Sequence, residues 1–168
     1  YIVQHGPKTD LAIVGEPTSL HPVVAHKGIN YYEVTFTGEA VHSSVPENGA
    51  NAISAAADFI KLIDEELATT YRQIKHPFVT SPTVTMNLIQ GGSKGNMAHL
   101  TDPDSAIAGT VADTCKVYLD VRYTPYQTSE DITKDIEKYA KLVEEKRAKI
   151  KSDVKLFLPH PAMEIASD

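Results

Sequence analysis

Tyr32-Glu33-Val34-Thr35-Phe36 alternates apolar and polar side chains along one short stretch of the chain. A period of two places every second side chain on the same face, so this stretch predicts a strand with one buried face. The alternation returns in three later stretches, whose apolar members are Val84, Met86 and Leu88; Cys115, Val117, Leu119 and Val121; and Val154, Leu156 and Leu158. The sequence therefore predicts four amphipathic strands.

Two stretches between these strands follow a helical period instead. The first lies between the first two strands, and Asn48 or Asn51 is available to cap its start. The second follows Thr128 and Asp131, which are spaced as a capping box. The apolar positions are Ile53, Ala56, Ala57, Ile60, Ile63 and Leu67 in the first stretch and Ile132, Ile136, Tyr139 and Val143 in the second.

The order of these elements is strand, helix, strand, strand, helix, strand. This is the ferredoxin-like split β-α-β arrangement of the α+β class. We expect a four-stranded antiparallel sheet with both helices on one face. Such a sheet has open edges, and two-fold pairing of an edge with a second copy would give a homodimer.

Composition excludes several classes of protein. The 168 residues carry a formal net charge of −6, which disfavours a nucleic-acid partner because phosphate backbones are also negative. No apolar run approaches the roughly 20 residues of a membrane-spanning helix, so we expect no membrane partner. The start of the chain lacks both a signal-peptide pattern and an initiator Met, which fits a fragment. The single cysteine, Cys115, fits a reducing, cytoplasmic compartment.

Three short strings carry candidate chemistry, and each alone has an ordinary structural explanation. Gly15-Glu16-Pro17-Thr18 reads as a solvated turn, and Val41-His42-Ser43-Ser44 as a polar loop. Leu119-Asp120-Val121-Arg122 reads as a strand with a surface ion pair. Their function has to be judged from their combination.

In this order, with Lys27-Gly28, Gly38 and Asn51-Ala52 between them, the strings resemble one family. It is the family of dinuclear zinc hydrolases that includes acetylornithine deacetylase, succinyl-diaminopimelate desuccinylase, carboxypeptidase G and the aminoacylases. The resemblance extends from Asp10 to about Arg122. It implies that this chain is the lid and dimerisation domain of such an enzyme.

The resemblance also implies a role for four residues. Glu16 matches a carboxylate ligand of one zinc ion. His42 matches a histidine that reaches into the partner subunit's active site and donates a hydrogen bond to the oxyanion. Arg122 matches an arginine that holds a substrate carboxylate, with Lys27 at a neighbouring basic position.

The rest of the family's zinc site is missing from this chain. There is no His-x-Asp, and Glu65-Glu66 and Glu144-Glu145 lie within helical patterns, where we expect a solvated face. The parent enzyme would hold two zinc ions per subunit. We expect this chain alone to bind none tightly and to be inactive.

One segment departs from the family pattern. The family has an asparagine that contacts substrate shortly after a Gly-Gly pair, and Asn96 follows Gly91-Gly92 here. Asn96 to Arg122 spans 122 − 96 = 26 positions, longer than the family norm. By distance from Arg122, Gly109 falls near the asparagine position instead. Residues 97–109 then read as a loop insertion.

We expect three segments along the chain. Residues 1–26 would hold the end of a catalytic-domain strand, including Leu11-Ala12-Ile13-Val14, and a linker. Residues 27–158 would form the lid and dimerisation domain. Residues 159–168 would form the linker that returns to the catalytic domain.

Two hypotheses for function follow. In the first, the parent is a metal-dependent hydrolase that cleaves an amide bond of an N-acyl amino acid or small peptide, as acetylornithine deacetylase or succinyl-diaminopimelate desuccinylase does in amino-acid biosynthesis. In the second, the chain is a free-standing ferredoxin-like module for dimerisation or small-molecule regulation. The second accounts for the fold but leaves Glu16, Lys27 and His42 unexplained.

Overall fold

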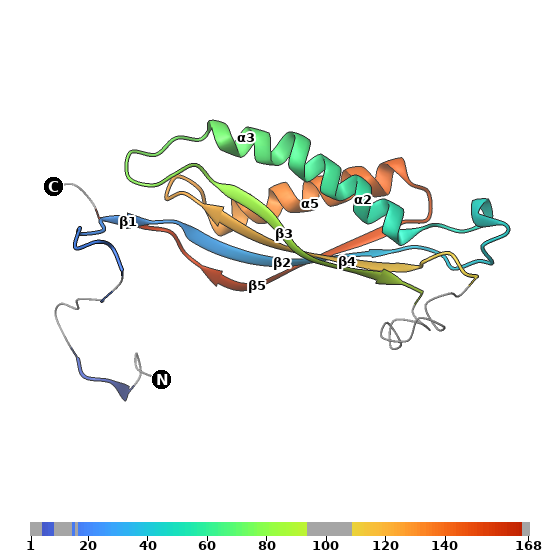
Figure 1. Cartoon of the computed structure of the whole chain (residues 1–168), viewed down its shortest axis with the longest axis horizontal. Coiled ribbons are helices and arrows are strands. Elements are labelled where there is room, and N and C mark those ends of the chain that lie inside the picture. Colours follow the sequence, from blue (N-terminus) through green and yellow to red (C-terminus); the bar gives the residue numbers. More distant parts are fainter. Residues whose placement is uncertain (1–4, 9–14, 16, 94–108, 166–168) are drawn as a thin grey trace.

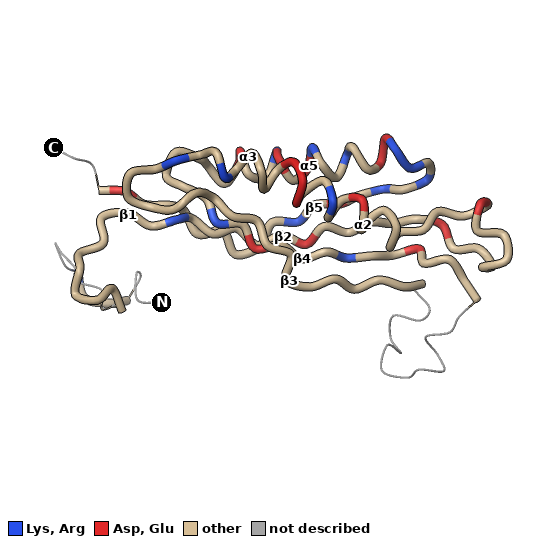
Figure 2. Tube along the Cα trace, turned by 45° about the horizontal axis from the view of Figure 1, so that its top comes forward, with Lys and Arg blue, Asp and Glu red and all other residues tan. Residues whose placement is uncertain are grey.

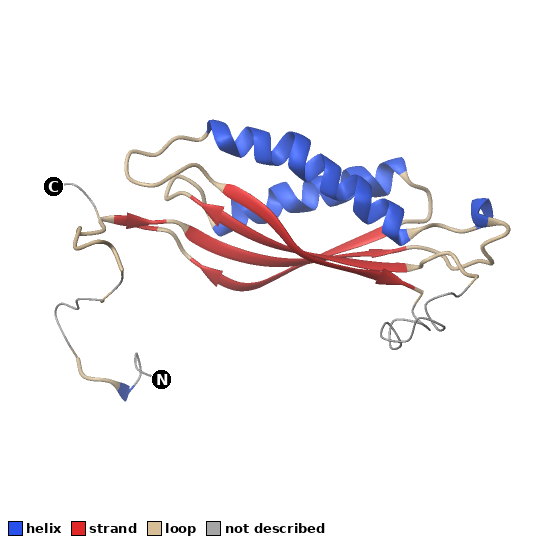
Figure 3. Cartoon of the chain, in the orientation of Figure 1, coloured by secondary structure: helices blue, strands red, loops and turns tan. Residues whose placement is uncertain are grey.

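The computed structural model describes residues 5–8, 15, 17–93 and 109–165. Two layers make up the molecule, a twisted antiparallel sheet and a layer of helices on one of its faces (Figure 1, Figure 3). The sheet order is β3-β4-β2-β5, which confirms the ferredoxin-like topology. The main strands are β2 (Gly28–Thr37), β3 (Thr83–Gly92), β4 (Thr114–Tyr123) and β5 (Lys151–His160).

The first helical stretch is continuous from Ala52 to Gln73 and divides into α2 (Ala52–Leu62), a π-helical turn (Ile63–Leu67) and α3 (Ala68–Gln73). Asn51 caps it, because its side chain accepts hydrogen bonds from the backbone N–H groups of Ile53 and Ser54 at 2.9 and 3.1 Å. The prediction of the buried face was wrong in the first turns of this helix, because Ile53 and Ala57 are exposed. The residues that the helix buries are Ala52, Ala55, Ala56, Phe59, Ile63, Leu67 and Tyr71.

The second helix, α5 (Ser129–Lys146), confirms its prediction closely. Thr128 and Asp131 form the reciprocal capping box, and all four predicted apolar positions are buried. Glu65, Glu66 and Glu145 are exposed, as expected. Glu144 is an exception, because it accepts hydrogen bonds from the backbone N–H and the hydroxyl of Ser152 on β5.

The core lies between the sheet and the helices. Its sheet side is the alternating set predicted for β2 and β4, with Val34 directly opposite Val117. A polar network closes one end of this core. There the buried Asn30 donates hydrogen bonds to the hydroxyls of Tyr32 and Ser129 at 2.7 and 2.9 Å.

Two irregularities interrupt the predicted alternation. In β3 the register shifts between Met86 and Leu88, so Leu88 pairs with Tyr118 on the open face and Ile89 pairs with the buried Val117. In β5 the register shifts opposite Ile29 and Tyr31, where Leu158 has a positive φ of 52° and is exposed. The predicted burial of Leu88 and Leu158 was therefore wrong.

A two-stranded ribbon extends one end of the sheet. It pairs β1 (Ala25–His26) with β6 (Met163–Glu164), so the chain enters and leaves the sheet side by side (Figure 1). β5 runs to His160, two residues past the boundary expected at residue 158. The division into segments 1–26, 27–158 and 159–168 remains a prediction, and the expected strand at residues 11–14 lies outside the described residues.

Candidate active-site residues at the two ends of the sheet

His42 lies in a loop that follows β2 and returns to α2. The base of this loop is closed by backbone hydrogen bonds in both directions between Glu39 and Ala50, each 3.0 Å long. Gly38 is required here, because a Cβ at this position would overlap the carbonyl oxygen of Ala50. The glycine of the Gly-x-x-x-His motif therefore allows the loop to close.

A second strand-like pairing holds the loop next to the segment before β4. The N–H of Ser43 donates to the carbonyl of Gly109 at 2.8 Å, and the N–H of Val111 donates to the carbonyl of Val41 at 2.9 Å. His42 itself pairs with Thr110 as an isolated bridge. Gly109, which lies near the family asparagine by sequence distance, is thus a direct neighbour of His42.

The imidazole of His42 is exposed, and its contacts come from its own turn. The hydroxyl Oγ of Ser44 lies 2.7 Å from Nδ1, and the backbone N–H of Ser44 donates to Nδ1 at 3.1 Å. Ser44 is a residue of this site that was not predicted from the sequence. Its position two residues after a histidine in a turn was the available signal, because this spacing lets a backbone N–H reach the preceding side chain.

Lys27 and Arg122 lie at the other end of the sheet. The ammonium of Lys27 donates to the carbonyl of Ser81, at 2.5 Å, in the loop before β3. Burial lowers the pKa of Lys27, and the nearby Arg122 guanidinium lowers it further. These two cations therefore share one electropositive corner.

Arg122 is already engaged by a carboxylate of its own strand. Its Nε and Nη2 donate to the two oxygens of Asp120 at 2.7 and 2.8 Å, and the guanidinium remains partly exposed. The hydrogen bond and charge of Asp120 raise the pKa of Arg122. A substrate carboxylate at Arg122 would have to share the guanidinium with Asp120 or displace it.

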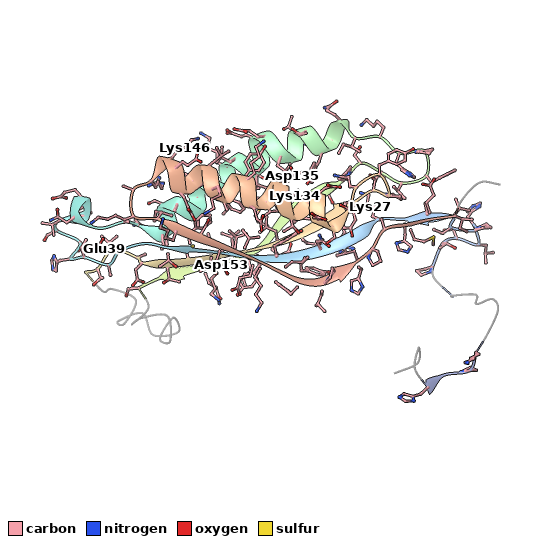
Figure 4. The ribbon with its side chains drawn as sticks, turned by 180° about the vertical axis from the view of Figure 1, so that it is seen from behind. Lys27, Glu39, Lys134, Asp135, Lys146 and Asp153 are labelled. Carbon is pink, nitrogen blue, oxygen red and sulfur yellow. The ribbon has the colours of Figure 1, made fainter. Side chains whose placement is uncertain are left out.

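One chain does not bring His42 and Arg122 together. They lie at opposite ends of β2, which has ten residues and a length of about 33 Å. Lys27, beside Arg122, and Glu39, in the loop of His42, are labelled at opposite ends of the sheet in Figure 4. A site that uses both ends has to combine two copies of the chain.

Glu16 and Asn96 lie outside the described residues, and so does most of the predicted insertion at 97–109. Among the described residues, no group of three or more His, Cys, Asp or Glu side chains could hold a metal ion. In the same part of the chain, no helix is long and apolar enough to cross a membrane. The described residues therefore do not fit a dinuclear metal centre by themselves.

The split β-α-β topology defines a ferredoxin-like α+β domain, and comparison with known families assigns it more closely. Residues 24–148 match the peptidase dimerisation domain, and the chain belongs to this family. It is similar to acetylornithine deacetylase from Photorhabdus laumondii, with 34% identity over 127 residues. The same enzyme from Yersinia pestis is 34% identical over 125 residues. Each alignment covers 74% of this chain and 30% or 29% of the relative, so the chain spans about a third of their length.

Solved structures share the fold at low sequence identity. A putative aminohydrolase from methicillin-resistant Staphylococcus aureus superposes with a TM-score of 0.63 and 20% identity, covering 86% of this chain and 33% of that chain. The aminopeptidase PepT from Bacillus cereus gives a TM-score of 0.58 and 16% identity, with the same coverage of each chain. The predicted family is confirmed. The family match favours the enzyme hypothesis over the free-standing module.

Proposed function

We propose that this chain dimerises a zinc-dependent amidohydrolase through the edge strand β3 and supplies His42 to the partner subunit's active site. The observation that carries the proposal is the placement of His42 and the Lys27–Arg122 corner at opposite ends of one sheet. Neither end forms a complete site in one chain. A two-fold dimer is the simplest arrangement that brings the two ends together.

The two edges of the sheet differ in a way that selects β3 for pairing. β3 carries no charged residue over Thr83–Gly92, as its uniform tan tube shows in Figure 2. β5, the opposite edge, carries Lys151, Asp153 and Lys155. Charged side chains on an edge strand discourage further pairing, whereas an uncharged edge accepts a second strand.

Exposed apolar side chains surround the β3 edge. Ile53 of α2 packs over Gly91 and is 42% exposed, and Leu88 and Ile89 are each 49% exposed. They lie on both faces of the same edge. Burying them against a second copy would remove apolar surface from water on both faces of a joined sheet.

Pairing of β3 with its two-fold copy is antiparallel. Thr83 lies opposite Arg122 and Gly92 lies opposite Thr114, near the His42 loop. Antiparallel pairing sets the Gly92 end of one strand beside the Thr83 end of the other. The His42 loop of one subunit then lies toward the partner subunit's Lys27 and Arg122.

The proposed reaction is hydrolysis of an amide bond in an N-acyl amino acid or small peptide, of the acetylornithine deacetylase or succinyl-diaminopimelate desuccinylase type. Arg122 and Lys27 would hold the substrate carboxylate, and His42 would donate to the oxyanion of the tetrahedral intermediate. Zinc, with Glu16 as one ligand, and the general base belong to a site that this chain does not complete. Either Asn96 or the region of Gly109 would take the substrate-contacting position. We also propose that the parent enzyme is cytoplasmic.

Sedimentation velocity at about tens of micromolar tests the assembly. We expect the wild-type chain to be a dimer and Ile89→Lys to be a monomer, because the substitution buries a charge in the joined sheet. Leu158→Lys is the matched control, since it places lysine at an exposed apolar position on the opposite edge strand. A dimer that survives Ile89→Lys but dissociates with Leu158→Lys would place the interface on β5 and contradict pairing through β3.

A further inference from the structure

Two groups of one residue converge on a single nitrogen of His42. The backbone N–H of Ser44 donates to Nδ1 at 3.1 Å, and the Ser44 hydroxyl lies 2.7 Å from the same atom. A backbone N–H is a donor in every protonation state of the protein. Nδ1 has to accept this hydrogen bond, because a proton on Nδ1 would face the amide proton directly.

The local turn holds this geometry in place. The N–H of Val45 donates to the carbonyl of His42 at 3.0 Å, which closes a turn over residues 42–45. The pairing of Ser43 with Gly109 fixes the other side of the turn. The backbone hydrogen bonds of the loop therefore hold the amide of Ser44 within hydrogen-bonding distance of Nδ1.

We propose that Ser44 is a positioning residue that holds the neutral imidazole of His42 in the tautomer with its proton on Nε2. A neutral imidazole has one N–H, and the tautomer decides which nitrogen can donate. With Nδ1 occupied as an acceptor, the donor is Nε2, on the side of the ring away from the turn. The inference rests on the proposed function, because it explains how His42 is prepared to donate to an oxyanion.

The surroundings of Nε2 agree with this role. Gly109 lies next to it, and a Cβ at that position would be 3.8 Å from Nε2, so the missing side chain leaves this nitrogen uncovered. Among the residues that the structure describes, none accepts a hydrogen bond from Nε2. A ligand atom that approaches this side of the ring meets an N–H already directed toward it.

The neighbouring Ser43 provides a matched control. Its backbone pairs with Gly109, and its Oγ would lie 3.4 Å from a Cβ at Gly109. The described contacts of His42 Nδ1 come from Ser44 alone. Ser43→Ala and Ser44→Ala therefore remove the same hydroxyl group from adjacent positions, only one of which faces Nδ1.

Long-range proton–nitrogen correlation spectra of the ¹⁵N-labelled chain test the tautomer directly, with the His42 ring assigned by its loss in His42→Gln. At a pH where the ring is neutral, we expect Nδ1 to resonate as a pyridine-type nitrogen and Nε2 as a pyrrole-type nitrogen. Ser44→Ala should raise the population with the proton on Nδ1 by about two- to tenfold, the range that one neutral hydrogen bond supplies. Ser43→Ala and the hydroxyl-retaining Ser44→Thr should match the wild type.

Turnover of the full-length parent gives the second readout. We expect Ser44→Ala to lower kcat in proportion to the lost Nε2–H population, by less than about twofold while that tautomer stays in the majority, with KM unchanged. A wild-type ring with its proton on Nδ1 would overturn the positioning role. Identical spectra for Ser44→Ala and wild type would overturn the contribution of the Ser44 hydroxyl. An Nε2–H tautomer combined with normal turnover in His42→Ala would instead uphold the tautomer and overturn the proposed function.

Discussion

Arg122 holds both carboxylate oxygens of Asp120 in a bidentate pair, with distances of 2.7 and 2.8 Å. In the parent enzyme, Arg122→Gln should raise KM by about ten- to a hundredfold, because a charged hydrogen bond to substrate is lost. kcat should change little, since a substrate carboxylate is held equally in the ground state and the transition state. Steady-state kinetics with an N-acyl amino acid separates the two constants.

The control for Arg122 lies on the same strand. Lys116 also pairs with a carboxylate, Glu33, at 2.8 Å, but it lies toward the other end of β4. Lys116→Gln should leave KM unchanged. An equal rise in KM for both variants, or no rise for either, would show that Arg122 does not bind the substrate and forms only a surface ion pair with Asp120.

His42→Ala in the full-length parent should lower kcat by about a hundred- to a thousandfold, the usual cost of losing one oxyanion donor. Folding should be intact, because His42 is exposed and lies outside the core. Circular dichroism and zinc content check that the loss is chemical. Turnover close to that of the wild type would leave His42 as a solvated loop residue.

Subunit mixing tests whether His42 acts across the interface. A mixture of His42→Ala subunits and subunits inactivated at a zinc ligand should show activity that neither variant has alone. One site in each heterodimer would then combine an intact metal centre with an intact partner histidine. A histidine acting within its own subunit would give no recovery.

Gly28 lies beneath the ring of Tyr123, and a Cβ at residue 28 would overlap that ring. Gly28→Ala should therefore lower the free energy of unfolding by about 1–3 kcal/mol, the range for overpacking a core. Urea denaturation measures this loss. Tyr123→Leu, combined with Gly28→Ala, should cost less than the sum of the two single changes, because the smaller side chain relieves the overlap.

Gly109→Ala is the matched control for Gly28→Ala. A Cβ at residue 109 would make only ordinary contacts, 3.4 Å from Ser43 Oγ and 3.8 Å from His42 Nε2. Its stability should equal that of the wild type. If both glycine variants lost the same stability, the loss would come from the backbone and not from the Tyr123 ring.

Glu144 links the end of α5 to the start of β5. Burial by itself raises the pKa of Glu144, but hydrogen bonds from Ser152 and Lys141 outweigh it and lower the pKa to about 2. Because the folded pKa is below the unfolded value, the stabilisation is fully present above about pH 4.5 and is lost as pH falls toward 2. We expect it to be on the order of 1–2 kcal/mol, after allowance for solvent screening.

Urea midpoints measured across this pH range test the linkage. Glu144→Gln should be less stable than the wild type at pH 7, and the difference should shrink as pH falls from 4.5 to 2. The exposed neighbour, Glu145→Gln, should show no such convergence. A constant difference between Glu144→Gln and wild type at every pH would attribute the effect to packing.

Local sequence alone determined the strands, the second helix and their order. Alternation in β2 and β4 and the capping box of Thr128 and Asp131 act over a few neighbouring residues, so they can be read without a fold. The combined motifs around Glu16, His42 and Arg122 also indicated the family. The ferredoxin-like topology followed, because few arrangements satisfy this order of elements.

Tertiary structure decided the features that depend on residues distant in sequence. Leu88 turns to the open face because of a bulge opposite β4, and Leu158 is exposed by a bulge opposite β2. The Gly28–Tyr123 contact and the placement of His42 beside Gly109 likewise arise only when strands pair. Cross-strand register and close packing are set by the partner strand, so the pattern within one strand cannot specify them.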